Sequence, residues 1–332
     1  MIKKPIQPKV VIIGGGTGVS VLLRGIKQST ENITAIVTVA DDGGGSGILR
    51  EDLGMLPPGD IRSCIVALAE DESIMQKLLN YRFTEGRLSG QSFGNLFIAA
   101  MNAISDNFVE AIKNVSDVMA IKGTVLPVTL DDITLIAELA NGRIVNGESA
   151  IPVTVQEVGS KIKTVKINPE KVHALPYCLE AIKEADIIIL GPGSLYTSVI
   201  PNILVENIEQ ALCNAKGKRY YISNLMTQPG ETQDYDLFDH VEAIESHLKC
   251  EENIIDYVVA NIGEASESVL APYREQGSDL VKIDLSRFTG SSPEFILDDF
   301  IEVKNGYVRH NAHKIVETIF NHYIKEKVYL EI

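Results

Sequence analysis

Short apolar runs rich in β-branched residues alternate with helical patterns along most of the chain. The clearest runs cover residues 10–13, 33–39, 185–190, 219–223, 256–260 and 280–283. After the first run, apolar residues recur at helical spacing over 19–26 and complete a strand–helix unit. Continuous apolar strands separated by helices are typical of a parallel sheet that is covered on both faces. We therefore predict an α/β protein with a mostly parallel sheet.

Further helical patterns lie between and after these strands, at 74–83, 96–101, 107–120 and 314–324. Another helix is predicted to start at Asp60, which would act as its N-cap. The segment between the second strand and this helix contains Arg50, Glu51 and Asp52, and we expect it to be a polar loop.

The pattern changes between residues 122 and 168. Four short β-like runs lie there, at 124–129, 134–139, 143–145 and 161–167. Two Asn-Gly pairs, Asn141-Gly142 and Asn146-Gly147, are strong signals for tight turns. The sequence thus predicts an antiparallel β excursion over 122–168. No linker composition separates it from the rest, so we expect one domain over 8–328.

Two glycine-rich turns, Gly14–Gly18 and Asp41–Gly47, directly follow the first two strands. A buried strand that ends in glycines and continues into a helix directs backbone N–H groups at an anion. The two turns should lie side by side at the carboxyl edge of the sheet, where open α/β sheets bind phosphorylated ligands. We therefore expect a nucleotide-containing ligand between the first two crossovers.

Neither turn matches a standard nucleotide motif. In the dinucleotide pattern G-x-G-x-x-G counted from Gly14, the third glycine would fall at Val19, and the Lys-Ser/Thr pair of an ATP-type loop is missing. A third turn, Gly191–Ser194, follows the strand at 185–190. Ser194 has no evident paired base, so it is better interpreted as an N-cap than as a nucleophile.

The polar residues near these turns allow several roles. Asp41 and Asp42 could bind ribose hydroxyls, hold Mg²⁺ beside a diphosphate, or accept bonds from their own loop. Asp60 could cap its helix or contact the ligand, and Arg62 could supply positive charge to a phosphate. Asn95 could contact the ligand or bond the adjacent loop.

Composition narrows the possible partners. A formal net charge of −15 disfavours nucleic acid and anionic membranes as partners. The four cysteines and six histidines show no metal-ligand spacing, so free thiols are expected. The N-terminus lacks a secretory pattern and no apolar run is long enough to span a membrane, so we expect a cytoplasmic protein.

An ordered set of motifs resembles the CofD-like superfamily over nearly the whole chain, and within it the gluconeogenesis factor branch, formerly UPF0052. The motifs are Gly14–Gly18, Asp41–Gly47 with Leu49-Arg50, Pro58–Arg62, Phe93–Leu96 and Gly191–Leu195. The resemblance implies a Rossmann-like three-layer α/β/α sandwich. It also implies proteins that bind UDP-sugars, notably UDP-N-acetylglucosamine, and regulate cell shape and wall-precursor supply during growth on gluconeogenic carbon sources.

The implied protein partner is the aminotransferase that makes glucosamine-6-phosphate, and a homo-oligomer is left open. The resemblance also implies a set of ligand-binding residues. In it, the first turn holds the diphosphate, Asp41, Asp42 and Asp60 form an acidic or Mg²⁺-binding side, and Tyr273 and Arg309 contact the UDP-sugar. The full set is Gly15, Gly16, Thr17, Gly18, Asp41, Asp42, Gly43, Gly44, Ser46, Asp60, Arg62, Asn95, Gly191, Gly193, Ser194, Asn224, Tyr273 and Arg309.

Two departures separate this sequence from the superfamily's enzymatic branch, the Mg²⁺-dependent 2-phospho-L-lactate transferases, which use a guanosine diphosphate carrier. Glycines follow Asp41-Asp42 where the transferases have a histidine-containing segment, and the Gly191–Leu195 turn differs from their Gly-Pro-Ser-Asn-Pro form. The leading hypothesis is therefore a UDP-sugar-binding regulator. The alternatives are such a transferase, with Asp41, Asp42 and Asp60 as catalytic residues and a GDP-linked donor, and an NAD-binding protein.

Overall fold

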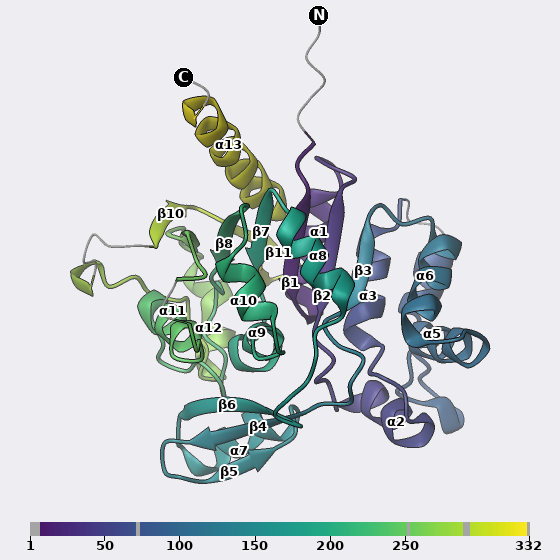
Figure 1. Cartoon of the computed structure of the whole chain (residues 1–332). Helices are drawn as coiled ribbons and strands as arrows, with labels where there is room; N and C mark the ends of the chain where they lie inside the picture. Colours follow the sequence, from purple (N-terminus) through teal and green to yellow (C-terminus); the bar gives the residue numbers. More distant parts are fainter. Residues whose placement is uncertain (1–6, 71–73, 251–252, 288–292, 331–332) are drawn as a thin grey trace, which may run out of the picture.

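A seven-stranded, wholly parallel sheet forms the centre of the computed structural model, which describes residues 7–70, 74–250, 253–287 and 293–330 (Figure 1). The strand order is β10-β9-β8-β7-β1-β2-β3. The strands are β1 Val10–Gly14, β2 Ile33–Val37, β3 Thr124–Pro127, β7 Ile187–Leu190, β8 Lys218–Ile222, β9 Tyr257–Asn261 and β10 Glu294–Asp298. The predicted mostly parallel α/β architecture is confirmed.

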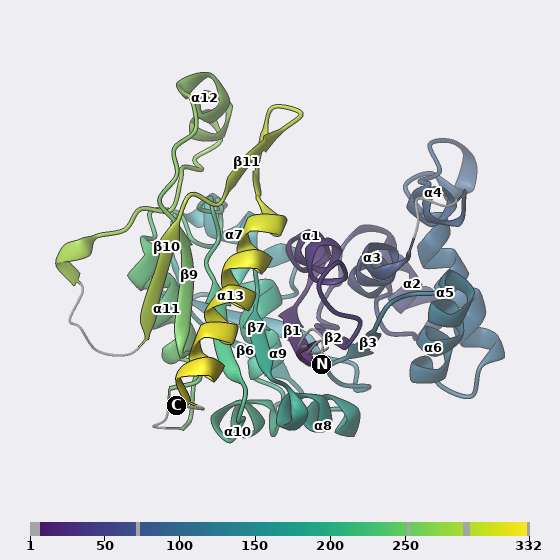
Figure 2. The same cartoon turned by 90° about the horizontal axis from the view of Figure 1, so that it is seen from above.

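Helices cover both faces of this sheet. Figure 2 shows α1 (Gly16–Ile26) and α3 (Gly59–Leu68) on one side, with α8 (Pro176–Glu184) and α10 (Ile208–Cys213) on the other. The C-terminal helix α13 (Ala312–Leu330) packs against α1. Every residue of β1 and β7 is buried, as expected for strands in the middle layer of a three-layer sandwich.

The strand order reverses between β1 and β7. From β1 the chain adds β2 and β3 on one side, whereas β7 returns to the opposite side of β1 and β8 to β10 extend from there. The register pairs Val10 with Ile33 on one side and with Ile187 on the other. A reversal of this kind leaves a crevice at the carboxyl ends of the two strands, where doubly wound proteins bind ligands.

A small lobe lies beyond the carboxyl edge of the sheet, on the opposite side from the two termini (Figure 1). It consists of the antiparallel strands β4 (Thr134–Leu139), β5 (Ile144–Asn146) and β6 (Ile162–Asn168) with helix α7 (Ala150–Val158). The predicted excursion is present but begins later than expected. Residues 124–127 form β3, which pairs in parallel with β2, because helices carry the chain back across the sheet before it.

Two predictions in the first half of the chain were wrong. The expected polar loop is helix α2 (Gly44–Leu53), which buries Ser46 and Leu49 and ends at Gly54 in a left-handed conformation. Pro58, not Asp60, is the N-cap of α3, and Asp60 lies in its first turn. The other helices of this half are α4 Ile74–Asn80, η1 Gly86–Leu88, α5 Phe93–Ile104 and α6 Phe108–Met119.

The second half differs from the prediction mainly near its end. The apolar run at 280–283 is not a strand, since Leu280 and Lys282 form only isolated bridges to Met226 and Asp236. Strand β10 pairs with β9 instead. The remaining elements are η2 Leu195–Val199, α9 Ile200–Ile203, α11 Leu237–Glu245, α12 Glu267–Glu275, η3 Leu285–Arg287 and the hairpin strands β11 Ile301–Lys304 and β12 Tyr307–His310.

A small second core joins α12 to this hairpin. Leu225, Leu270 and Val308 are its buried members, and Tyr273 packs against them. The two elements project together from the main body in Figure 2. The hairpin is therefore held mainly by a satellite cluster and not by the large core of the sheet.

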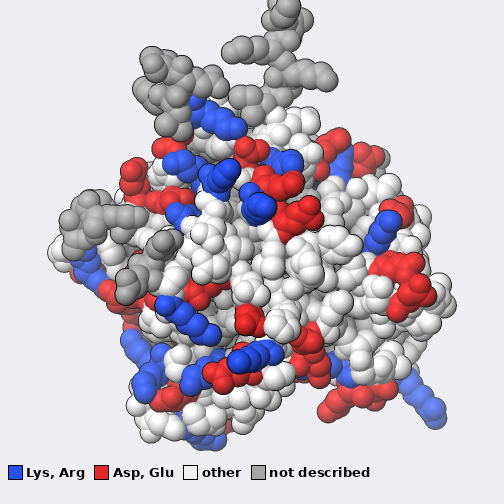
Figure 3. Space-filling model, viewed as in Figure 1, with Lys and Arg blue, Asp and Glu red and all other residues white. Residues whose placement is uncertain are grey.

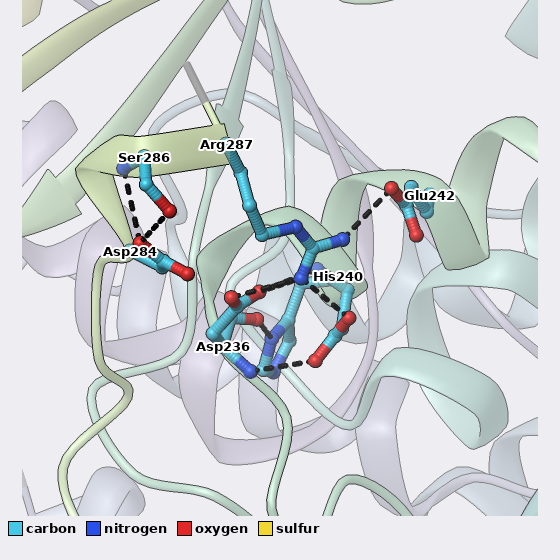
Figure 4. Close-up of polar contacts among 7 residues, drawn as sticks. Asp236, His240, Glu242, Asp284, Ser286 and Arg287 are labelled. Carbon is cyan, nitrogen blue, oxygen red and sulfur yellow. Dashed lines mark hydrogen bonds and ion pairs between the residues drawn. The ribbon is translucent and has the colours of Figure 1, made fainter.

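An ion-pair network fixes η3 to α11 (Figure 4). Arg287 donates to Asp236, Asp239 and Glu242, each at 2.8 Å, and Asp236 and Asp239 also form the capping box of α11. These carboxylates raise the pKa of Arg287. Elsewhere on the face shown in Figure 3, basic and acidic side chains alternate, without a continuous basic area.

Candidate functional site

A cavity of about 440 Å³ lies at the β1/β7 reversal. The turns after β1, β7 and β8 and the strand β12 form its walls. The lining residues are Gly15, Gly16, Thr17, Gly18, Val21, Pro192, Gly193, Ser194, Ser198, Asn224, Leu225, Met226, Gln228, Val308, Arg309 and His310. The structure thus brings together eight of the predicted ligand-binding residues: Gly15, Gly16, Thr17, Gly18, Gly193, Ser194, Asn224 and Arg309.

Glycines allow the two turns at the reversal to touch. A Cβ atom on Gly18 would overlap the backbone carbonyl of Pro192, and one on Gly14 would lie 2.8 Å from a methyl group of Val19. Gly16 has a left-handed φ of +65°. Gly191, whose φ is +73°, bends the chain after β7 and donates its N–H to the carbonyl of Ile13. Close contact between the turns places the N-terminus of α1 beside Gly193.

Neutral amides form the wall that follows β8. Asn224 accepts a hydrogen bond from the N–H of Gly193 at 3.3 Å through Oδ1. Gln228 donates to the hydroxyl of Ser194 at 2.9 Å through Nε2, while its Oε1 is buried without a partner. A buried acceptor that lacks a donor costs free energy, so a ligand that supplies one gains affinity here.

Strand β12 supplies the cationic wall. Arg309 is exposed, lies 5.1 Å from the ring of Tyr307 and, among the residues that the structure describes, donates a hydrogen bond only to the carbonyl of Val308. Its side chain can therefore turn toward an anion in the cavity. Next to it, burial lowers the pKa of His310 to about 4, and its Nδ1 has no partner. His310 is thus a neutral imidazole at pH 7.

Tyr273 does not line the cavity. Its hydroxyl accepts a hydrogen bond from the N–H of Val308 at 3.0 Å, from helix α12. The structure gives it a positioning role, because it holds the strand that carries Arg309. The resemblance implied a direct ligand contact for Tyr273, which stays a prediction.

Asp60 supports the first turn from behind. A Cβ on Gly15 would lie 2.5 Å from its Oδ2, and the N–H of Gly16 donates to it. Burial and repulsion by Asp41 raise the pKa of Asp60 to about 6, although the Gly16 hydrogen bond and Arg62 lower it. Asp60 therefore couples the glycine turn to the acidic residues that follow β2.

The second glycine turn lies outside the cavity. Asp42 accepts the N–H groups of Glu148 and Ser149, each at 2.9 Å, and thereby ties this turn to the small lobe. Asp41 accepts from its own loop at Gly43, at 2.9 Å. The cavity therefore lies between β1 and β7, and not between β1 and β2 as predicted.

Gly191, in the turn after β7, is not among the lining residues, and the other predicted residues surround the second turn. Gly43 and Gly44 begin α2, and Ser46 is buried beneath it, 2.5 Å from where a Cβ on Gly59 would lie. Arg62 donates to the hydroxyl of Ser92 at 2.9 Å. The Oδ1 atom of Asn95 is buried without a partner. These side chains pack a polar core under α2 and do not reach the lining of the cavity.

Glu148 lies in an acidic group with Asp41 and Asp42. Burial and repulsion by Asp41 and Asp42 raise the pKa of Glu148 to about 7. Within the described part of the chain, no three His, Cys, Asp or Glu side chains are arranged to hold a metal ion. Mg²⁺ at Asp41 and Asp42 therefore stays a prediction.

Sequence reasoning missed Gln228, Ser198, Met226 and His310 as lining residues. For Met226 and Gln228 the signal was their position shortly after β8, whose carboxyl end faces the same edge as β1 and β7. For His310 the signal was its position beside Arg309. The structure also contains no helix, among the residues it describes, that is long and apolar enough to cross a membrane.

A parallel sheet with a reversal of strand order and glycine turns beside it defines a Rossmann-like α/β fold. The chain belongs to the family described as 2-phospho-L-lactate transferase CofD, whose model matches residues 10–301.

Within that family it is similar to gluconeogenesis factors. A protein of Clostridium acetobutylicum named "Putative gluconeogenesis factor" is 51% identical over 98% of this chain and 71% of that protein. The gluconeogenesis factor of Bacillus subtilis is 43% identical over 94% of this chain and 97% of that protein. A crystal structure of a UPF0052 family protein from Bacillus halodurans superposes with a TM-score of 0.89, at 43% identity over 95% of this chain and 99% of that one. The resemblance drawn from the motifs is confirmed.

Proposed function

We propose that this protein binds a nucleotide-sugar of the UDP-N-acetylglucosamine type and acts as a regulator of cell-wall precursor supply, and through it of cell shape, on gluconeogenic carbon sources. The name that its relatives carry supports the link to gluconeogenesis. The cavity at the β1/β7 reversal supports the choice of ligand.

The chemical groups that line the cavity are the main support for this proposal. The turn N–H groups and Arg309 offer positive charge at one side, and Asn224, Gln228 and His310 offer neutral hydrogen-bonding groups at the other. None of the described lining residues is Asp or Glu. A diphosphate diester with polar groups at both ends matches such a wall, because its charge meets donors and its sugar hydroxyls meet neutral partners.

The position of Arg309 suggests how binding could be communicated. Arg309 lies on a hairpin that packs against the small second core. A ligand that engages Arg309 would favour one arrangement of this hairpin, and a partner protein would recognise that arrangement. A glucosamine-6-phosphate synthase is the proposed partner, because it makes the precursor of the ligand.

Isothermal titration calorimetry tests the ligand. UDP-N-acetylglucosamine, GDP and NAD are each titrated with and without Mg²⁺, and we expect the UDP-sugar to bind in the micromolar range without a requirement for the metal. Tight binding of GDP together with turnover of a lactyl-diphosphate donor would instead support the transferase. Binding of NAD alone would support the dinucleotide alternative.

One observation favours the alternative that the protein is a transferase. Asp60, beside Asp41, touches the glycine turn that would hold a diphosphate. Turnover that is lost in Asp60→Asn and in Asp41→Asn but kept in an exposed carboxylate control, Asp52→Asn, would assign these residues to catalysis. We expect no turnover in any of the four proteins.

A further inference from the structure

Two of the four cysteines form a close pair. The Sγ atoms of Cys213 and Cys250 lie 2.8 Å apart, and both residues are partly buried thiols. Cys213 ends α10, and Cys250 lies in the segment between α11 and β9. From this pair we infer that the protein carries a dithiol modification site that reacts with small-molecule disulfides to form a Cys213–Cys250 disulfide.

The backbone around the pair is held in place. One carboxylate oxygen of Glu209, on α10, accepts the N–H groups of Lys249 and Cys250, each at 2.6 Å. These two bonds fix the segment that carries Cys250 to the helix that ends in Cys213. The sulfurs therefore meet without a loop having to close first, which gives the intramolecular reaction a high effective concentration.

The two thiols share one hydrogen bond, in which either sulfur can be the donor. Burial and hydrogen bonds to Cys213 and Glu209 raise the pKa of Cys250 to about 12. Because the thiolate is the nucleophile, whichever thiol loses its proton attacks first, and the adjacent thiol resolves the adduct.

The reaction balances in two exchange steps. The thiolate of one cysteine of the pair, for example Cys213, attacks one sulfur of the small disulfide and forms a mixed disulfide, and one small thiolate leaves. The Cys250 thiol then gives up its proton and attacks the Cys213 sulfur, which expels the second small thiolate. Two protein thiols are oxidised to one disulfide, and the small disulfide is reduced to two thiols.

The remaining cysteines serve as internal controls. Cys64 and Cys178 are fully buried, so a small disulfide cannot reach either sulfur, whereas Cys213 and Cys250 are only partly buried. Neither should react in the folded protein. Cys213 precedes β8 and Cys250 precedes β9, so the pair lies at the amino edge of the sheet, away from the ligand cavity. The inference therefore does not rest on the proposed ligand.

The test treats the full-length reduced protein with oxidised glutathione and follows intact mass and peptide maps. We expect the protein to lose the mass of two hydrogen atoms, with one cross-linked peptide joining Cys213 and Cys250. In Cys250→Ser, glutathione should remain attached to Cys213, and this mixed disulfide should persist at least about tenfold longer than in the natural protein.

Cys178→Ser is the matched control, because its hydroxyl can keep the hydrogen bond that the thiol makes to the carbonyl of Pro127. It should form the disulfide as the natural protein does. Stable glutathione adducts on both Cys213 and Cys250 of the natural protein, or earlier reaction of Cys64 or Cys178, would overturn the inference.

Thermal unfolding gives an independent measurement. A cross-link restricts the unfolded chain, so the oxidised protein should unfold at a higher temperature than the reduced protein. Titration of the nucleotide-sugar should give the same affinity in both states. A lower unfolding temperature after oxidation would mean that the fold must distort to bring the sulfurs together, and would count against the site.

Discussion

The two glycine-rich turns look alike in sequence and differ in what they do. The turn after β1 meets the turn after β7, and a cavity opens between them. The turn after β2 meets polar side chains instead: a Cβ on Gly45 would lie 2.8 Å from Oε1 of Gln91, and one on Gly47 would overlap the carbonyl of Asp42. Glycines of the first turn line a cavity, whereas Gly45 and Gly47 of the second turn allow close packing.

The neighbouring strand explains this difference. β1 lies where the strand order reverses, so no crossover helix covers the gap between its carboxyl end and that of β7. β2 lies between β1 and β3, and the chain that leaves it folds into α2 over its own end. Glycines at the end of a strand therefore do not identify a ligand site by themselves. The strand that lies beside it in the sheet must also be known.

The largest expected effect is that of Gly18→Ala. The new methyl group would overlap the carbonyl of Pro192 and push apart the two turns that form the cavity. Overpacking of this kind costs about 1–3 kcal/mol of stability, and we expect nucleotide-sugar affinity to fall about a hundredfold or more. Chemical denaturation and calorimetry measure the two losses.

Gly47→Ala is the matched change in the second turn, where the methyl group would overlap the carbonyl of Asp42. It should cost similar stability yet leave the affinity of the remaining folded protein unchanged. Equal losses of affinity in both variants would show that the two turns do not differ in their contribution to binding.

The next largest effect is expected for Arg309→Ala. A hydrogen bond between a guanidinium group and a phosphate is worth about 1.5–3 kcal/mol, so affinity should fall tenfold or more while stability stays the same. Calorimetry with UDP-N-acetylglucosamine checks this. Arg143→Ala, an exposed arginine in the turn between β4 and β5, is the control and should bind normally.

Asp60 connects the two turns, and its titration tests that connection. The pKa of Asp60 is raised from its ordinary 3.8 to about 6, so the folded chain binds the proton more tightly than the unfolded chain. The stability that protonation provides is complete below about pH 4 and is lost as pH rises through about 6.

Asp60→Asn removes this penalty and keeps an acceptor for the N–H of Gly16. We expect the variant to be more stable than the natural protein by about 3 kcal/mol at pH 8 and nearly equal to it at pH 4. Denaturant unfolding at both pH values measures the difference. An equal difference in stability at pH 4 and pH 8 would show that the surroundings do not raise the pKa of Asp60.

The smallest effects are expected at two left-handed glycines. Gly16 and Gly44 have φ values of +65° and +48°, and alanine at either position should cost about 1–2 kcal/mol of stability. Only Gly16→Ala should also lower nucleotide-sugar affinity, because Gly44 does not line the cavity. Loss of affinity in Gly44→Ala would extend the binding site to the second turn.

Much of the fold could be predicted because buried parallel strands are continuous apolar runs. Residues 10–13 and 185–190 stood out for that reason. The run at 280–283 is also mostly apolar, with Lys282 among its four residues. The place beside β9 is nevertheless taken by β10, and sequence alone does not show which segment forms the edge strand. Helix α2 was missed because its apolar positions are few and its first residues are glycines.

The site could be predicted in its parts but not in its assembly. Gly15–Gly18, Gly193 and Asn224 each follow a strand, which made them candidates. That β7 lies beside β1 depends on the order of strands in the sheet, which no local pattern records. Asp42 likewise looked like a ligand residue because its true partners, Glu148 and Ser149, belong to a lobe more than a hundred residues later.

The pairing of β1 with β7 also affects how the chain can mature during translation. Val10–Ile13 emerge from the ribosome more than 170 residues before Ile187–Leu190 do. Until then one edge of a fully apolar strand has no neighbour and is open to aggregation. We expect a nascent chain that stops before Ile187 to require a chaperone and to be unable to bind any nucleotide.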